Sequence, residues 1–199
     1  MRKIAFLLLF SGSILCHAAE NEALNQDKSI ACVACHGANG VSPSPEWPNL
    51  AGQHKEYLIK QMTLFKEGKK RNNPLMVAPM ANLTSQDISE LADYYSKQPL
   101  AKLSTPKEYL KKGEQLYRGG DFSKHISACI ACHGPRGLGN PQANFPVLSG
   151  QQPMYTIQTL EAYQNGTRTS DMNEIMRNIS KRMSKEDMEA VAYYVSGLH

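Results

Sequence analysis

Apolar side chains recur at helical spacing along the chain, and glycine- and proline-rich segments separate the helical stretches. From Tyr57 to Phe65 they fall on one helical face, and Gly68 provides a C-terminal stop. Thr84 and Ser184 each precede another such stretch and stand three residues before an aspartate, which is close to a capping-box pattern. The apolar positions that follow are Ile88, Leu91, Ala92 and Tyr95 in one stretch and Met188, Val191, Ala192 and Val195 in the other. The loops between helices show no strand-like alternation, so the pattern predicts an all-α fold.

The helical stretches belong to an internal repeat. The segment 32–37, Cys-Val-Ala-Cys-His-Gly, returns at 129–134 as Cys-Ile-Ala-Cys-His-Gly, an offset of 97 residues. The segment 83–88 returns at 183–188, an offset of 100 residues. The offset changes by only three residues between these two segments, which indicates a duplicated domain of roughly 90 residues.

The repeat divides the chain into two predicted domains. The N-terminal domain spans residues 20–102 and the C-terminal domain spans residues 103–199, with a linker around Pro99 to Pro106. Each domain is too small to bury an extensive apolar core. We therefore expect a large buried cofactor to help hold each domain together.

Residues 1–19 have the layout of a cleaved signal peptide. Arg2 and Lys3 provide the positive start, and the apolar stretch 4–15 ends in small residues. That stretch is about a dozen residues long, whereas a membrane-spanning helix needs roughly 20, so we favour a cleaved signal over a retained anchor. Cys16 is expected to leave with the signal, and the mature protein is predicted to be exported.

Composition narrows the class of protein further. The 199 residues are 41% hydrophobic and 20% charged, which fits neither a disordered chain nor a polytopic membrane protein. The formal net charge is +4, and losing two of the 22 basic residues with the signal, against 18 acidic ones, leaves +2. So small an excess does not indicate nucleic-acid binding.

Four of the five cysteines stand in a repeated Cys-x-x-Cys-His motif, the attachment motif of c-type haem. Positions i, i+3 and i+4 lie on one face of a helix, so two thiols can bond the vinyl groups of a porphyrin while the imidazole reaches the iron. The two copies are Cys32, Cys35 and His36, and Cys129, Cys132 and His133. They predict two covalently bound haem c groups with histidine as one iron ligand. A zinc site would leave each histidine unexplained, and a disulfide within Cys-x-x-Cys is a feature of redox enzymes.

A methionine opposite the histidine completes the ligand set typical of electron transfer. The candidates downstream of the histidines are Met76, Met80, Met172 and Met176. Met76 and Met176 occupy equivalent positions, each seven residues before the helix-capping segment of its half, so we predict these two as iron ligands. Met80 has no equivalent methionine, but it stays the alternative to Met76 because spacings within the two halves are not identical.

Further expectations concern the surroundings of each predicted haem. Trp47 and Phe145, each followed by a proline, are expected to cover one haem edge. Lys70 and Arg168 correspond across the repeat and could neutralise haem propionates, but a solvated surface charge is the favoured interpretation of each. Three histidines without a counterpart are interpreted as surface or loop residues: His54, His125 and His199.

Together these features resemble the dihaem cytochrome c4 family over essentially the whole mature chain. The likeness rests on the two Cys-x-x-Cys-His-Gly motifs, the Leu-(Ala/Ser)-Gly-Gln turns, the segment 113–120 and the ending Ser-Gly-Leu-His at 196–199. The resemblance implies two class I cytochrome c domains about a pseudo-twofold axis, with haem propionate edges facing each other. It also implies methionine ligands at Met76 and Met176, and electron transfer in the periplasm, typically towards a membrane-bound terminal oxidase.

We therefore expect a periplasmic electron carrier, not an enzyme, that transfers single electrons between respiratory partners by outer-sphere transfer. Its partners would be membrane-bound or periplasmic redox proteins, with at most peripheral membrane association and no nucleic acid. The alternative is the dihaem electron-accepting subunit of a periplasmic dehydrogenase such as flavocytochrome c sulfide dehydrogenase. A dihaem peroxidase or gas sensor would need an open iron site, which the methionines in each half oppose.

Overall fold

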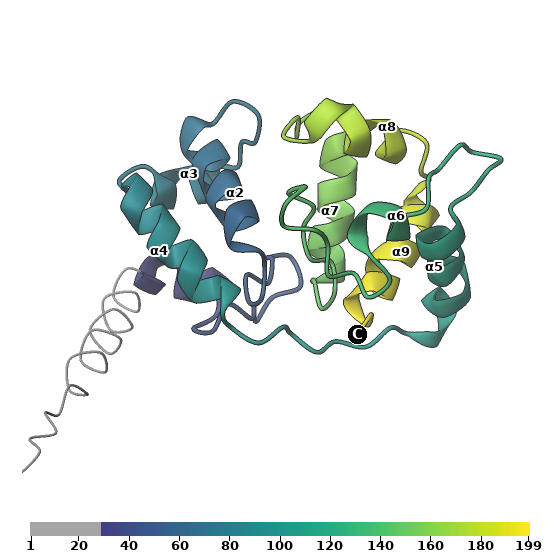
Figure 1. Ribbon diagram of the computed structural model, residues 1–199, viewed down its shortest axis with the longest axis horizontal. Helices are drawn as coiled ribbons and strands as arrows, with labels where there is room; N and C mark the ends of the chain where they lie inside the picture. Colours follow the sequence, from purple (N-terminus) through teal and green to yellow (C-terminus); the bar gives the residue numbers. More distant parts are fainter. Residues whose placement is uncertain (1–28) are drawn as a thin grey trace, which may run out of the picture.

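The computed structural model describes residues 29–199. The predicted signal peptide, Cys16 and the first residues of the predicted N-terminal domain lie outside that range. None of the helices within it is both long enough and apolar enough to cross a membrane. The helices form two groups that stand side by side, joined by a helix-free segment, residues 97–106, that runs along one edge of the molecule (Figure 1).

The N-half, residues 29–102, is helical at 29–36 and then contains three helices: α2 (Lys55–Glu67), α3 (Pro74–Met80) and α4 (Ser85–Ser96). The C-half, residues 103–199, contains α5 (Lys107–Gly119), α6 (Ile130–His133), α7 (Pro153–Gln164), the 3-10 helix η1 (Met172–Glu174), α8 (Ile175–Ser180) and α9 (Lys185–Ser196). Three isolated β-bridges are the only extended pairing in the described part of the chain. The predicted all-α fold is confirmed there.

The predicted helix ends are confirmed. Gly68 follows α2 in the left-handed conformation, with φ of 66°, and its N–H donates to the Leu64 carbonyl. Thr84 and Ser184 form reciprocal capping boxes with Asp87 and Asp187, in which side chain and backbone satisfy each other at the helix start. Local sequence therefore determines where α4 and α9 begin.

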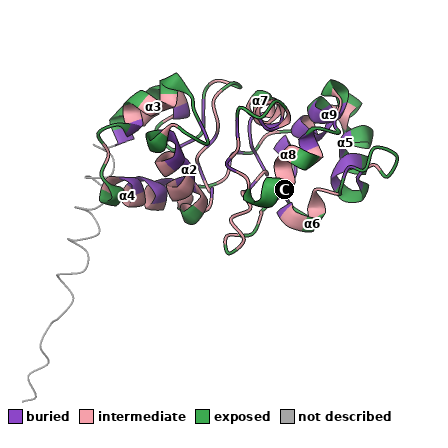
Figure 2. Cartoon of the chain, turned by 90° about the horizontal axis from the view of Figure 1, so that it is seen from above, coloured by how far each residue is buried: buried purple, intermediate pink, exposed green. Residues whose placement is uncertain are grey.

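Each half has a core of its own, and the core of the N-half is the smaller one. In the N-half, Leu58 of α2 packs with three residues of α4: Leu91, Ala92 and Tyr95. In the C-half, α9 contributes Met188, Val191, Tyr194 and Val195 to a larger cluster with α5 and α7. The apolar positions predicted for α4 and α9 are all buried. Figure 2 shows exposed positions on the outer surfaces of α3 and α5.

Helices α5 and α9 cross closely, because Gly113 presents no side chain at the contact. A Cβ at this position would lie 2.4 Å from both the Ala190 carbonyl oxygen and the Tyr194 Cβ. One α5 residue, Tyr117, also reaches the haem-attachment motif, since its hydroxyl donates to the Gly134 carbonyl at 2.5 Å. The helix crossing thus fixes the loop that follows His133.

Asp187 ties three segments of the C-half together. Its side chain is 1% exposed and lies 2.9 Å from the Lys112 ammonium of α5 and 2.7 Å from that of Lys124. Burial alone would raise the pKa of Asp187, but hydrogen bonds from Lys124, Ser184 and Lys112 outweigh it and hold the pKa well below the usual aspartate value.

We predict that Asp187→Asn lowers the free energy of unfolding by about 2 kcal/mol at pH 7, because both lysines lose a charged acceptor. The folded-state pKa lies below the unfolded value, so the contribution is present above about pH 4 and is lost as the pH falls further. Urea unfolding at pH 7 and pH 3 should therefore show a difference between variant and parent that shrinks in acid. Asp87→Asn, at the equivalent but half-buried position, is the control and should cost less. A pH-independent difference would contradict the account.

Candidate functional site

The two motif histidines are held in the same way in both halves. His36 and His133 are buried, and each Nδ1 contacts a proline carbonyl oxygen: Pro48 at 2.9 Å and Pro146 at 3.0 Å. A carbonyl only accepts, so each Nδ1 carries the hydrogen and each Nε2 keeps a free lone pair. Burial lowers the pKa of both imidazoles, which are therefore neutral at pH 7. Neutral imidazole with a fixed Nδ1–H is the form that binds a metal ion.

The four motif cysteines are unpaired, half-buried thiols. Burial raises the pKa of Cys32 and raises that of Cys129 to about 11, so both stay protonated at neutral pH. Across residues 29–199, no three side chains of the His, Cys, Asp and Glu types converge on a point where they could hold a metal ion. The geometry gives no support to the zinc alternative, which needs four ligands together.

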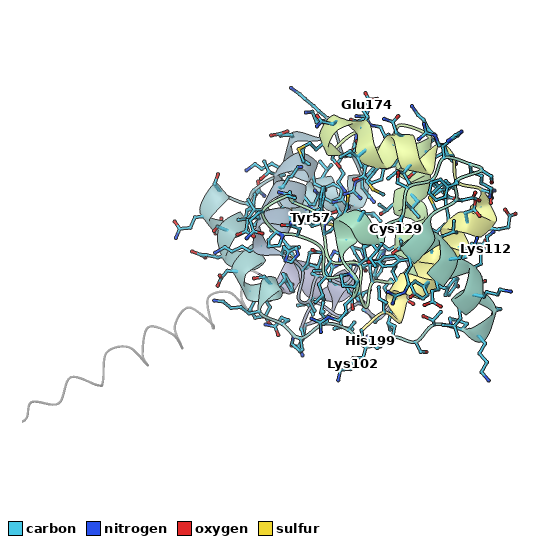
Figure 3. All side chains as sticks on the ribbon, turned by 45° about the vertical axis from the view of Figure 1, so that its right-hand side comes forward. Tyr57, Lys102, Lys112, Cys129, Glu174 and His199 are labelled. Atoms are coloured by element: carbon cyan, nitrogen blue, oxygen red, sulfur yellow. The ribbon has the colours of Figure 1, made fainter. Side chains whose placement is uncertain are left out.

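All four thiols and both histidines line one cavity of about 890 Å³. It extends between the two halves, and Tyr57 of the N-half and Cys129 of the C-half, both among its lining residues, lie toward the centre of the molecule in Figure 3. Trp47 and Phe145 line it as well, and their covering of haem edges stays a prediction. The size, the mostly apolar lining and two sets of two thiols and one imidazole fit two c-type haems.

Four methionines compete for the second position at the irons. Met76 and Met80 both line the cavity from α3, and Met80 is only 2% exposed. Met176 lines it from α8 and packs against the core of the C-half, whereas Met172 in η1 also lines the cavity but is 49% exposed. The assignment of Met76 and Met176 stays a prediction.

A symmetric set of hydrogen bonds joins the two halves beside the cavity. The Gln53 side chain accepts from the Val147 N–H and donates to the Val147 carbonyl, both at 2.9 Å. The Gln151 side chain does the same with Asn49, at 2.8 and 3.0 Å. Gln53 and Gln151 are equivalent in the repeat, so each half holds the other through the same residue, as a pseudo-twofold axis requires.

The residues flanking these glutamines add contacts across the same interface, and sequence reasoning missed them. The His54 imidazole contacts the Leu138 carbonyl at 2.8 Å, and the Gln152 amide at the equivalent position donates to the Ser42 carbonyl at 3.2 Å. Both partners are backbone oxygens, which leave no signal in the pattern of side chains. His54 is therefore an interface residue as well as a loop residue.

The prediction for Arg168 as a solvated surface charge is wrong. Arg168 is 4% exposed, whereas Lys70 is exposed as expected. The structural counterpart of Arg168 is Arg71, which is also buried and pairs with it in an antiparallel β-bridge. The correspondence predicted from the repeat was out by one residue in the loop after Gly68. Both arginines line the cavity.

Known proteins share this architecture. The family model Cytochrome c matches residues 16–98 and again residues 110–199. Cytochrome c4 of Pseudomonas aeruginosa is 39% identical, with 98% of each chain covered. The crystal structure of reduced recombinant cytochrome c4 from Pseudomonas stutzeri superposes with a TM-score of 0.85 at 38% identity, covering 89% of this chain and 98% of that one. A thiosulfate dehydrogenase electron acceptor of Thiomonas intermedia is 34% identical, covering 93% of this chain and 86% of its own.

We predict that Gln53→Ala and Gln151→Ala each lower the free energy of unfolding by about 2 kcal/mol, because each leaves one buried N–H and one buried carbonyl unsatisfied. The symmetry of the interface makes the two losses similar. Denaturant unfolding measures them, and amide exchange should accelerate at Val147 in the first variant and at Asn49 in the second. Gln86→Ala on the exposed surface of α4 is the control. Losses no larger than that of the control would contradict the role given to these glutamines.

Proposed function

The chain belongs to the cytochrome c family, and on that premise we propose that it is a periplasmic electron carrier passing single electrons between respiratory proteins, towards a terminal oxidase. The family match occurs twice, and each match contains one Cys-x-x-Cys-His motif. The protein is thus a dihaem electron-transfer cytochrome with two covalently bound haem c groups. The observation that carries the proposal is that two sets of ligands, each of two cysteine thiols and one histidine, line one cavity.

We assign the haem attachments by half, with residues 20–102 and 103–199 as the two domains. Cys32 and Cys35 would form thioethers with one haem, and Cys129 and Cys132 with the other. The Nε2 atoms of His36 and His133 would bind the irons, with the proline carbonyls holding each ring in orientation. The sulfur atoms of Met76 and Met176 would complete the two ligand sets.

Each haem, when bound, supplies an iron that takes up and releases one electron. The protein keeps the surroundings of each iron unchanged while the iron gains or loses the electron. The buried histidines and the glutamine contacts across the interface hold both donor sets in fixed positions, and the mostly apolar lining disfavours water beside the irons. A histidine–methionine ligand set at both sites leaves no position open for a substrate, which suits a carrier and not an enzyme.

A second candidate function is electron acceptance from a dedicated dehydrogenase. The similarity to a thiosulfate dehydrogenase electron acceptor favours it specifically. A thiosulfate dehydrogenase thus joins flavocytochrome c sulfide dehydrogenase, the example named from the sequence, as a candidate enzyme. Native chromatography of a periplasmic extract separates the two possibilities. A free carrier elutes alone, whereas an enzyme subunit elutes with a dehydrogenase.

We predict that the oxidised protein shows the far-red methionine-to-iron charge-transfer band, and that the reduced protein does not bind carbon monoxide. Met76→Leu and Met176→Leu should each remove about half of the band, since leucine supplies no sulfur to one of two irons. Optical spectra with a haem-to-protein ratio measure both effects.

The matched controls are Met80→Leu and Met172→Leu, which should keep the band. If Met80→Leu loses the band and Met76→Leu keeps it, Met80 is the iron ligand of the N-half instead of Met76. Prompt carbon monoxide binding by the unsubstituted protein would mean an open iron site and would overturn the carrier function.

A further inference from the structure

Two buried guanidinium groups lie together at the interface between the halves. Arg71 is 9% exposed and Arg168 is 4% exposed. One oxygen, Oε1 of Gln61, accepts from both, at 2.6 Å from Arg71 Nη1 and 3.0 Å from Arg168 Nη2. Phe65 and Tyr163 each stack against one guanidinium, with ring-centroid distances of 4.2 and 4.6 Å. Packing and hydrogen bonds therefore fix both groups in place.

Each guanidinium is held by the opposite half. Arg71 donates from Nη2 to the Tyr155 hydroxyl at 2.6 Å, and Arg168 donates from Nη2 to the Tyr57 hydroxyl at 2.9 Å. Tyr57 and Tyr155 are equivalent in the repeat, so the arrangement has the same pseudo-twofold symmetry as the glutamine contacts. Neither arginine site is complete within its own half.

The described residues provide no counter-charge for this pair. Within residues 29–199, no ion pair joins either guanidinium to a carboxylate, and the groups that accept from them are the neutral side chains of Gln61, Tyr57, Tyr155 and Ser170. A buried, unpaired charge is costly, and two adjacent like charges are more so. Burial would raise the pKa of Tyr155, but Arg71 and Arg168 outweigh it and lower the pKa to about 8. The site therefore favours an anion.

The arginine pair lines the cavity that would hold the cofactors. Both arginines and both tyrosines line the same cavity as the motif cysteines and histidines of the two halves. A c-type haem carries two carboxylates, its propionates, and the planar fork of arginine suits carboxylates in two-point contact. Propionates are thus the anions that the proposed function itself brings into this cavity.

We propose that Arg71 and Arg168 form one shared anion site for the propionates of both haems, so that the midpoint potential of each haem depends on an arginine from each half. The inference rests on the two haems of the proposed function. A positive charge near a haem favours the reduced state, which carries one positive charge fewer. Because the two guanidiniums share Gln61 and are held by the opposite halves, loss of either one changes the field at both haems.

Spectroelectrochemical titration of the holoprotein tests the proposal. Arg71→Gln and Arg168→Gln should each shift both midpoint potentials downward, and the double variant should shift them further. Arg71→Lys and Arg168→Lys keep the charge and should restore most of the shift, which a purely structural role of the arginine fork would not predict. Lys70→Gln, which removes an exposed charge next to Arg71, should leave both midpoints in place.

A shift of only one midpoint, or of neither, in both glutamine variants would overturn the shared site. If a glutamine variant does not retain two haems, Tyr57→Phe and Tyr155→Phe test the same claim with both charges kept. Each removes a hydroxyl that positions one guanidinium and should move both midpoints by a smaller amount, and unchanged midpoints would contradict the proposal. Absence of two reducible haems in the unsubstituted protein would instead refute the proposed function.

Discussion

The structure depends on a cavity that the polypeptide does not fill itself. In the N-half, the buried cluster is built around one residue of α2 and three of α4, which is little apolar packing for a domain of this size. A cavity of about 890 Å³ lies between the two halves, and most of the surface that lines it is apolar. Covalent attachment of two large planar groups supplies the missing packing. The helices therefore serve mainly to enclose the two cofactors.

The two halves are held together by equivalent residues of the repeat, each of which contacts the opposite half. Gln53 and Gln151 bind the backbone of the opposite half, and beside them Arg71 and Arg168 are held by tyrosines of the opposite half. These contacts surround the cavity, so the interface and the cofactor sites form one structure. An electron carrier with two haems needs a fixed distance between them and a charge that acts on both. Electron transfer from one haem to the other then requires no rearrangement of the protein.

Local chemistry was readable from the sequence, whereas contacts across the interface were not. Capping boxes at Thr84 and Ser184 and the spacing of Cys-x-x-Cys-His are short-range patterns. The structure confirms the capping boxes, and both motifs line one cavity. The role of Gln53 depends on the backbone of a loop about a hundred positions away, which no periodicity reveals. For Arg168 the sequence favours a surface position because single charged side chains are usually solvated, and a one-residue shift in a loop pairs it with Lys70 instead of Arg71. The methionine ligand of the N-half stayed open because Met76 and Met80 are one helical turn apart on α3.

The intact mass of the mature protein, measured under denaturing conditions, tests the central claim most directly. Haem that is merely bound is lost in denaturant, whereas haem held by thioethers stays on the chain. The account predicts a mass equal to that of the polypeptide plus two haem groups, and plus one when Cys129 and Cys132 are both replaced by alanine. A polypeptide mass with one haem or none would contradict the claim that the cavity is built around two covalently held cofactors.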